Sequence, residues 1–124
     1  MRIYISGPIT GRDRNVVIEA FYNAEAMLIE RGHIVVNPLR IAEQMPENSE
    51  WKAYMAADLP ALFECDAIYQ LDGWRSSNGC KLENQAAIYA RMQRFNAVYL
   101  PPWAHPALEY LSRRKQEDGR KRRK

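Results

Sequence analysis

Residues 2–8 read RIYISGP, a short run of β-favouring residues that stops at a glycine followed by a proline. Isoleucine and tyrosine so close together are typical of a strand, and Gly-Pro turns the chain away from it. The pattern predicts a first strand over residues 2–6. The glycine-rich loop that follows is then the first place to look for a ligand.

The chain beyond this strand alternates between extended and helical patterns. Short β-favouring runs predict strands over residues 2–6, 33–36, 66–71 and 96–100. Apolar residues at helical spacing predict helices over residues 16–31, 50–64 and 79–93, with a final helix opening at Pro106. The apolar face of helix 79–93 is predicted to carry Leu82, Ala86, Tyr89 and Ala90.

The region from residue 39 to residue 64 leaves alternatives open. Residues 39–48 have room for a short helix, and Asn48-Ser49 is a candidate cap for the helix that begins near Glu50. Pro60 lies inside that helix. The helix therefore either kinks at Pro60 or restarts there with Asp58 as its N-cap.

Strands separated by helices call for right-handed crossovers, so the predicted fold is α/β with a parallel sheet. We expect a small doubly wound, flavodoxin- or Rossmann-like sheet of about four strands, with helices on both faces. Ligands of such folds bind at the carboxyl ends of the strands. That rule selects the loops after the first and third predicted strands.

Charge divides the chain into two parts. Residues 113–124 (RRKQEDGRKRRK) hold eight Lys or Arg against two acids, whereas residues 1–112 carry ten basic and thirteen acidic side chains. We predict an α/β domain over residues 1–112 and a basic, disordered tail over residues 113–124. Weak, salt-sensitive contact of the tail with nucleic acid is the alternative.

Cys65 and Cys80 have no metal-binding spacing and form no disulfide framework, which suits a reducing cytoplasm. The N-terminus has no signal-peptide pattern, and no apolar stretch approaches the roughly 20 residues of a membrane helix. His33 and His105 are isolated from acids and cysteines, so no metal site is predicted. We expect a cytoplasmic protein with no membrane contact.

The loop after the first strand, residues 6–12 (SGPITGR), is one candidate site. Its glycines let the backbone approach a ligand closely, and its arginine adds a charge suited to a phosphate. A tight turn with a solvent-facing arginine explains the same residues. The candidate ligand-binding residues of this loop are Ser6, Gly7, Pro8, Ile9 and Arg12.

The loop after the third strand, residues 72–78 (DGWRSSN), leads into helix 79–93. Free N–H groups in the first turn of a helix attract an anion, and the Ser77 hydroxyl and the Gly79 amide would join them. Trp74 is a candidate pocket wall. Glu83 lies one turn further on, either as a surface acid favoured by the helix dipole or as a catalytic group.

Three stretches together carry a family resemblance: residues 4–8 (YISGP), Asp58-Leu59 with Leu62 and residues 65–67 (CDA), and Ser77-x-Gly79-x-x-x-Glu83. Over about residues 1–100 the chain resembles the nucleoside 2-deoxyribosyltransferase superfamily, which includes the 2′-deoxynucleoside 5′-monophosphate N-hydrolases. It is most similar to short bacterial and phage members of unassigned activity.

The resemblance implies an activity and a catalytic set. Glu83 would attack the anomeric carbon of a deoxyribose, Asp58 would assist at the base, and Tyr4 would position Glu83. By their residues alone, an N-cap is the favoured explanation of Asp58, and a core or cross-strand aromatic is the favoured explanation of Tyr4. No cofactor or metal is implied, and a homo-oligomer, dimer or higher, is usual in the family.

Ser77 indicates which substrate to expect. In this superfamily an acid at that position binds a free 5′-hydroxyl, whereas a serine helps to hold a 5′-phosphate. The resemblance therefore implies cleavage or exchange of the N-glycosidic bond of a 2′-deoxynucleoside 5′-monophosphate. The alternatives are action on a nucleoside, or a non-catalytic nucleotide-binding or sensor module. Lys81 and Asn84 stand where the family commonly has glycine, and Lys81 either points to solvent or charges the pocket.

Overall fold

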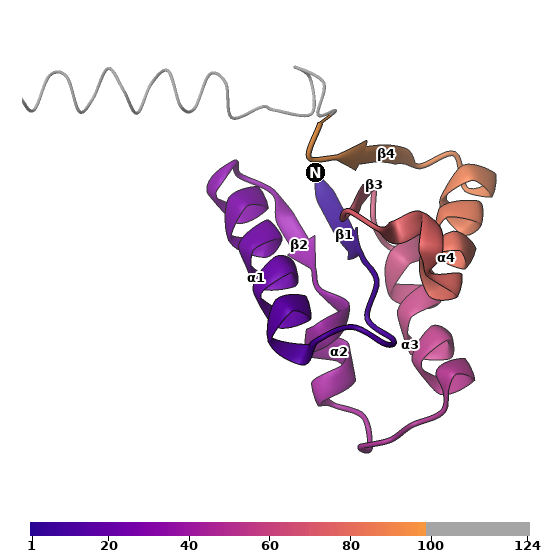
Figure 1. The fold of residues 1–124 in the computed structure, drawn as a ribbon. Helices are drawn as coiled ribbons and strands as arrows, with labels where there is room; N and C mark the ends of the chain where they lie inside the picture. Colours follow the sequence, from indigo (N-terminus) through magenta and orange to yellow (C-terminus); the bar gives the residue numbers. More distant parts are fainter. Residues whose placement is uncertain (99–124) are drawn as a thin grey trace, which may run out of the picture.

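The computed structural model of the protein describes residues 1–98 and confirms a parallel α/β fold (Figure 1). The predicted final helix, the basic tail and the end of the fourth predicted strand lie outside the described residues. The elements in chain order are β1 (Arg2–Ser6), α1 (Arg14–Glu30), β2 (Ile34–Val36), α2 (Pro38–Glu43), α3 (Trp51–Phe63), β3 (Ala67–Gln70), the short 3₁₀ turn η1 (Trp74–Ser76), α4 (Asn78–Tyr89) and β4 (Gln93–Asn96).

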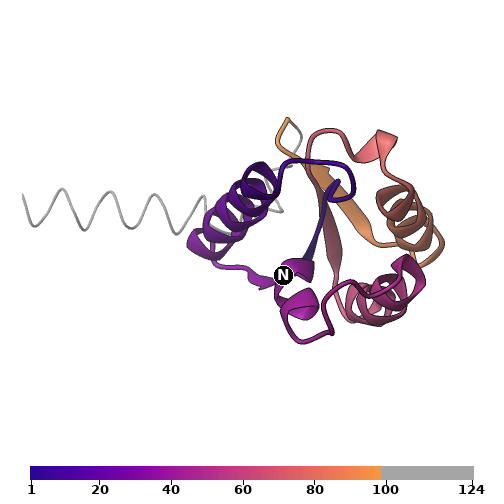
Figure 2. The same ribbon diagram turned by 60° about the horizontal axis from the view of Figure 1, so that its bottom comes forward.

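The described sheet has the strand order β2-β1-β3-β4, and all its pairings are parallel. Helix α1 covers one face, while α3 and α4 cover the other (Figure 2). After β1 the chain continues to β2 at one edge of the sheet, and after β3 it continues to β4 at the opposite edge. The carboxyl ends of β1 and β3 therefore flank the crevice where ligands of such sheets bind.

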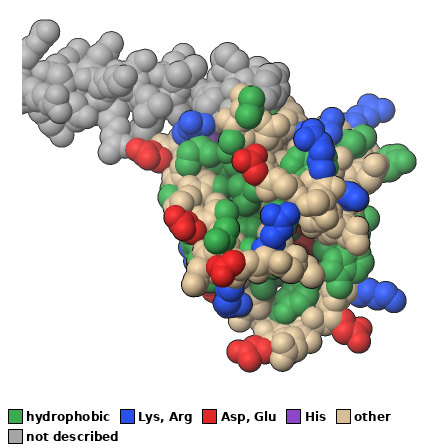
Figure 3. Space-filling model, in the orientation of Figure 1, with side chains coloured by type: hydrophobic (Ala, Val, Ile, Leu, Met, Phe, Trp, Pro, Cys, Tyr) green, Lys and Arg blue, Asp and Glu red, His purple; other side chains and the backbone are tan. Residues whose placement is uncertain are grey.

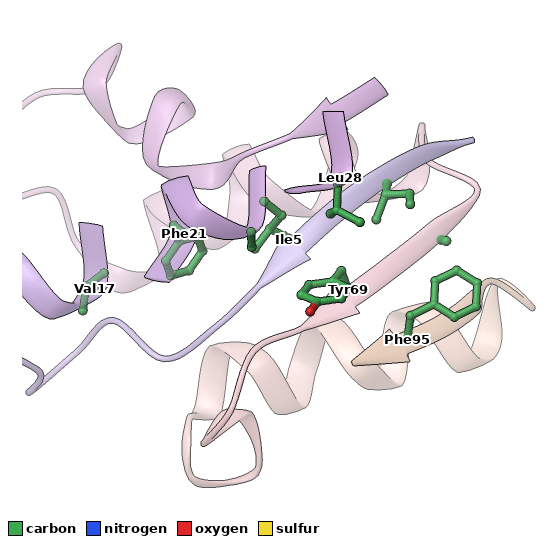
Figure 4. Packing of buried hydrophobic residues seen from close by; sticks show 9 residues of the cluster. Ile5, Val17, Phe21, Leu28, Tyr69 and Phe95 are labelled. Atoms are coloured by element: carbon green, nitrogen blue, oxygen red, sulfur yellow. The ribbon is translucent and has the colours of Figure 1, made fainter. Parts of the chain in front are cut away.

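Alternation along β1 directs its side chains to two cores. Ile3 and Ile5 join the α1 side with Phe21, Leu28, Tyr69 and Phe95, several of which Figure 4 shows packed across the sheet. Tyr4 points to the opposite side and joins the core under α3 and α4. Ser6, at the carboxyl end of β1, is buried on the same side as Tyr4.

Helix α3 runs unbroken from Trp51 to Phe63, so of the two alternatives the restart at Pro60 is wrong. Asp58 lies inside the helix and is not an N-cap. The cap position is Glu50, not Asn48-Ser49, because the Ser49 hydroxyl donates to the Pro46 carbonyl instead. Pro60 removes one helical hydrogen bond, a loss that is tolerable because Pro60 is exposed.

The prediction for the face of α4 is wrong. The buried residues of α4 are Cys80, Glu83, Asn84 and Ala87, whereas Tyr89 is 85% exposed. Apolar spacing misses this face because two of its members are polar residues that find partners in the interior. The helix also ends at Tyr89, and β4 begins at Gln93, three residues before the predicted strand.

Gly7 lets Leu71 and Phe21 pack closely against the chain just after β1. A Cβ atom placed on Gly7 would lie 2.6 Å from Leu71 Cδ1 and 3.0 Å from Phe21 Cζ. We expect Gly7→Ala to lower the free energy of unfolding by about 1–3 kcal/mol, the usual cost of overpacking. Urea unfolding measures this loss. The control is Gly11→Ala, where no atom crowds the Cβ and only the strain of a positive φ angle is added; an equal or larger loss in that variant would contradict the steric explanation.

Candidate functional site

Glu83 is held by two hydroxyl groups from β1. The Tyr4 hydroxyl donates to Glu83 Oε2, and Ser6 Oγ donates to Oε1 at 2.8 Å. Only 6% of the Glu83 surface is exposed, and Tyr4 and Ser6 are fully or almost fully buried. The structure thus brings three of the predicted site residues together across 79 positions of sequence.

The interior raises the pKa of the Glu83 carboxyl to about 7. Burial is the main cause, because it removes water from the charged form, and the nearby charge of Asp58 adds to it. The hydrogen bonds from Tyr4 and Ser6 act in the opposite direction. Glu83 therefore exchanges its proton near neutral pH.

Asp58 reaches the same region from α3. Burial raises the pKa of Asp58 to about 6, and its charge raises the pKa values of both Glu83 and Tyr4. The pKa of Tyr4 is itself raised, first by burial and then by Glu83, so the phenol stays protonated and donates to Glu83. The half-buried Asp58 carboxyl thus interacts electrostatically with the buried Glu83 carboxyl and the buried Tyr4 phenol.

Ser77 is the N-cap of α4, and its side chain accepts from the Cys80 amide at 3.3 Å. Gly79, the second residue of α4, lies against α3. A Cβ atom on Gly79 would be 3.5 Å from Met55 Sδ and 3.7 Å from Trp51 Nε1. A Cβ atom at Gly79 would therefore make ordinary van der Waals contact with α3, the helix that carries Asp58.

Arg12 joins the two candidate loops. Its Nη2 donates to Ser76 Oγ at 3.0 Å, so the loop after β1 contacts η1 just before the start of α4. The guanidinium also packs closely against Gly73, where a Cβ atom would lie 3.2 Å from Nη2. Arg12 thereby brings a positive charge near the N-terminus of α4.

A family model for a domain of unknown function, DUF4406, matches residues 1–99. The chain belongs to the DUF4406 family. A comparison with curated proteins found no match. The match spans every helix and strand described above, so the Glu83 cluster and both loops lie within the DUF4406 domain.

The other predicted ligand-binding residues lie on the loop after β1 and on η1. Ile9 is exposed, and Trp74 is half-buried in η1 with the guanidinium of Arg75 4.9 Å from its ring. Pro8 and Arg12 line a cavity of about 310 Å³. That cavity also touches Phe21 and Tyr69, which belong to the α1 side of the sheet.

Lys81 and Asn84 differ in their positions on α4. Lys81 is exposed, so of its two predicted placements the structure supports the one in solvent. Asn84 is buried, and its Oδ1 accepts from Gln70 Nε2 at 2.7 Å and from Arg94 Nη1 at 3.1 Å. Sequence reasoning missed Gln70 and Arg94 because their meeting point depends on the strand order.

Basic and acidic side chains are interspersed on the face drawn in Figure 3. Within residues 1–98, no helix is both long enough and apolar enough to cross a membrane.

Proposed function

We propose that this protein cleaves or exchanges the N-glycosidic bond of a 2′-deoxynucleoside 5′-monophosphate through Glu83. The observation that supports the proposal best is the buried Glu83 carboxyl, fixed by Tyr4 and Ser6 and titrating near pH 7. A surface acid of the helix dipole needs neither burial nor partners. Perturbed carboxyl pairs at the carboxyl edge of a parallel sheet are typical of functional sites.

The proposed reaction resembles that of retaining glycosidases, in which one carboxylate is the nucleophile and a second carboxyl group is the acid and base. Glu83 as carboxylate attacks the anomeric carbon, a C–O bond forms, and the C–N bond to the base breaks. The proton for the departing base nitrogen comes from Asp58, in the minor fraction of molecules in which Asp58 rather than Glu83 holds it, because the pKa of Glu83 lies above that of Asp58. Water, or a second base, then displaces Glu83 from the sugar and returns a proton to Asp58. Hydrolysis and exchange differ only in that acceptor.

Tyr4 and Ser6 have an orienting role in this proposal. Their hydroxyls fix the plane of the Glu83 carboxylate. As hydrogen-bond donors they also stabilise its negative charge where water is excluded. Neither needs to lose a proton. The raised pKa of Tyr4 agrees with that role.

The phosphate would lie at the start of α4. Arg12, the Ser77 hydroxyl and the free amides of the first helical turn supply donors suited to a dianion. Pro8, Ile9, Trp74 and Gly79 would line the remainder. We also propose that the protein is cytoplasmic, where the buried Cys65 and Cys80 would stay free thiols. The resemblance further suggests a homo-oligomer.

Ser77→Asp is expected to separate phosphate recognition from folding. Aspartate is as good an N-cap as serine, so the free energy of unfolding should stay nearly constant. The new charge should weaken binding of the monophosphate about 10- to 100-fold, because a hydrogen bond to a charged group turns into repulsion. Calorimetric titration with the monophosphate and with the unphosphorylated nucleoside checks this. An equal loss of affinity for both ligands would show that Ser77 does not contact the phosphate.

The proposed activity is tested by incubating the purified protein with the common 2′-deoxynucleoside 5′-monophosphates and following free base by chromatography. We expect release that saturates with substrate concentration and that increases in rate when a second base is added, if exchange occurs. Release no faster than in buffer, for every substrate, would reject the proposal.

The second candidate is a nucleotide-binding module without catalysis. It is favoured by the low exposure of Glu83, whose two oxygens already accept from Ser6 and Tyr4. In that case Glu83 anchors α4 to β1 and never meets a sugar. Saturable nucleotide binding without base release would support this candidate.

A further inference from the structure

The carboxyl edge of the sheet contacts α4 at two successive residues. Ser6 of β1 donates to Glu83, and Gln70 of β3 donates to the next residue, Asn84. Ser6 and Gln70 are register partners in neighbouring strands. Two neighbouring residues of the sheet thus donate hydrogen bonds to two successive residues of the helix.

Asn84 receives a second donor from the far strand. Arg94 of β4 donates to the same Oδ1 that accepts from Gln70, so one amide oxygen joins α4 to both β3 and β4. Asn84 is 9% exposed and Gln70 is buried. An interior amide donor that lost this acceptor would remain unsatisfied, which makes the contact hard to give up.

Successive residues of a helix point about 100° apart. Glu83 and Asn84 therefore face different strands, and holding both fixes the rotation of α4 about its axis. Any turn that moved Glu83 away from Ser6 would also pull Asn84 from Gln70. The pair constrains the helix more tightly than either contact alone.

We propose that Asn84 is a positioning residue that holds the carboxylate of Glu83 against Tyr4 and Ser6. Asn84 touches no reacting atom in this proposal. It acts through the orientation of α4, with Gln70 and Arg94 as its partners. The inference rests on the proposed role of Glu83 for its effect on rate, but its effect on the placement of Glu83 is independent of any activity.

The test compares Asn84→Ala with Asn84→Asp and with Gln85→Ala, an exposed neighbour on α4. Asn84→Asp keeps an oxygen that accepts from Gln70 and Arg94. Asn84→Ala removes it. Circular dichroism first establishes that each variant is folded. If Asn84→Ala does not fold, the titration of Glu83 in Asn84→Asp still tests the inference.

The first measurement is a carbon-13 NMR titration of the Glu83 carboxyl. The groups around it are Tyr4 on β1, Asp58 on α3 and Cys80 on α4, and Arg94 reaches Asn84 from β4. The wild-type midpoint is expected near 7. Asn84→Ala should move it down by more than about half a unit as water enters, because burial, the largest cause of the raised pKa, outweighs the hydrogen bonds from Tyr4 and Ser6 that act against it. Asn84→Asp and Gln85→Ala should not lower it.

The second measurement is the rate of base release. Asn84→Ala is expected to lower kcat about 10- to 100-fold and to change KM much less, since misplacing a reacting group affects the chemical step. Asn84→Asp should recover most of the rate. If the wild-type protein releases no base, the proposed function fails and the titration alone decides. A wild-type midpoint in Asn84→Ala, or a midpoint in Asn84→Asp as low as that of Asn84→Ala, would overturn the inference.

Discussion

Glu83→Gln is expected to reduce base release from a 2′-deoxynucleoside 5′-monophosphate by at least about 10³-fold, because a neutral amide cannot form the sugar ester. The substitution keeps the shape of the side chain. Its amide oxygen can accept from one of the two hydroxyls, Tyr4 or Ser6, and its NH₂ group can donate to the other. Nucleotide binding should therefore change little while turnover is lost.

Glu19→Gln is the matched control for this loss. It makes the same chemical change at an exposed position of α1 and should leave the rate of base release unaltered. Steady-state assays of wild type and both variants provide the comparison. If Glu83→Gln kept more than about a tenth of the wild-type rate, Glu83 would not be the nucleophile.

The same substitution should make the protein more stable at alkaline pH. The native pKa of Glu83, about 7, lies above the ordinary value of 4.5, so the folded state binds this proton more tightly than the unfolded state. At a pH above about 7 the native protein carries the full cost of a buried charge. That cost is about 3 kcal/mol at 1.36 kcal/mol per pKa unit.

The sign follows from proton linkage. The free energy of unfolding of the wild type should fall as pH rises from about 4.5 to 7, and Glu83→Gln lacks this contribution. Near pH 8 the variant should gain up to about 3 kcal/mol, which corresponds to about 10 °C or more in Tm for a domain of this size. Near pH 4.5, where Glu83 is protonated, the two proteins should differ little.

Thermal unfolding across this pH range measures the effect without any substrate. Burial also raises the pKa of Asp58, so its ionisation too lowers the free energy of unfolding as pH rises. Wild type and variant should both keep that part of the pH dependence. A variant less stable than wild type near pH 8 would show that the Glu83 charge stabilises the fold. It would contradict the buried, desolvated carboxyl described above.

The order of strands and helices could be predicted because local patterns and chain connectivity carry that information. The Gly-Pro pair after β1 is a local feature, and so is Gly32, which has a positive φ angle just after the end of α1. Strands joined through helices leave few alternatives to a parallel sheet. Ser77 could likewise be singled out as a hydroxyl beside the first turn of a helix, and the structure makes it the N-cap of α4. The resemblance contributed Tyr4, Asp58 and Glu83 as one set.

The interior polar contacts could not be predicted from such patterns. Glu83 and Asn84 occupy the buried face of α4, where spacing favoured Leu82 and Tyr89, because their partners come from β1, β3 and β4. Burial of a polar side chain depends on a partner, and partners far apart in sequence meet only once the strand order is known. The sequence left the course of α3 at Pro60 open for a similar reason, because the exposure that lets the helix continue depends on the fold.

The most direct measurement of the central proposal is mass spectrometry of the protein quenched in acid during reaction with a 2′-deoxynucleoside 5′-monophosphate. We expect a deoxyribose 5-phosphate adduct on the peptide that contains Glu83, present in wild type and absent from Glu83→Gln. Base release without an adduct, or an adduct on a peptide lacking Glu83, would contradict a covalent role for this carboxylate.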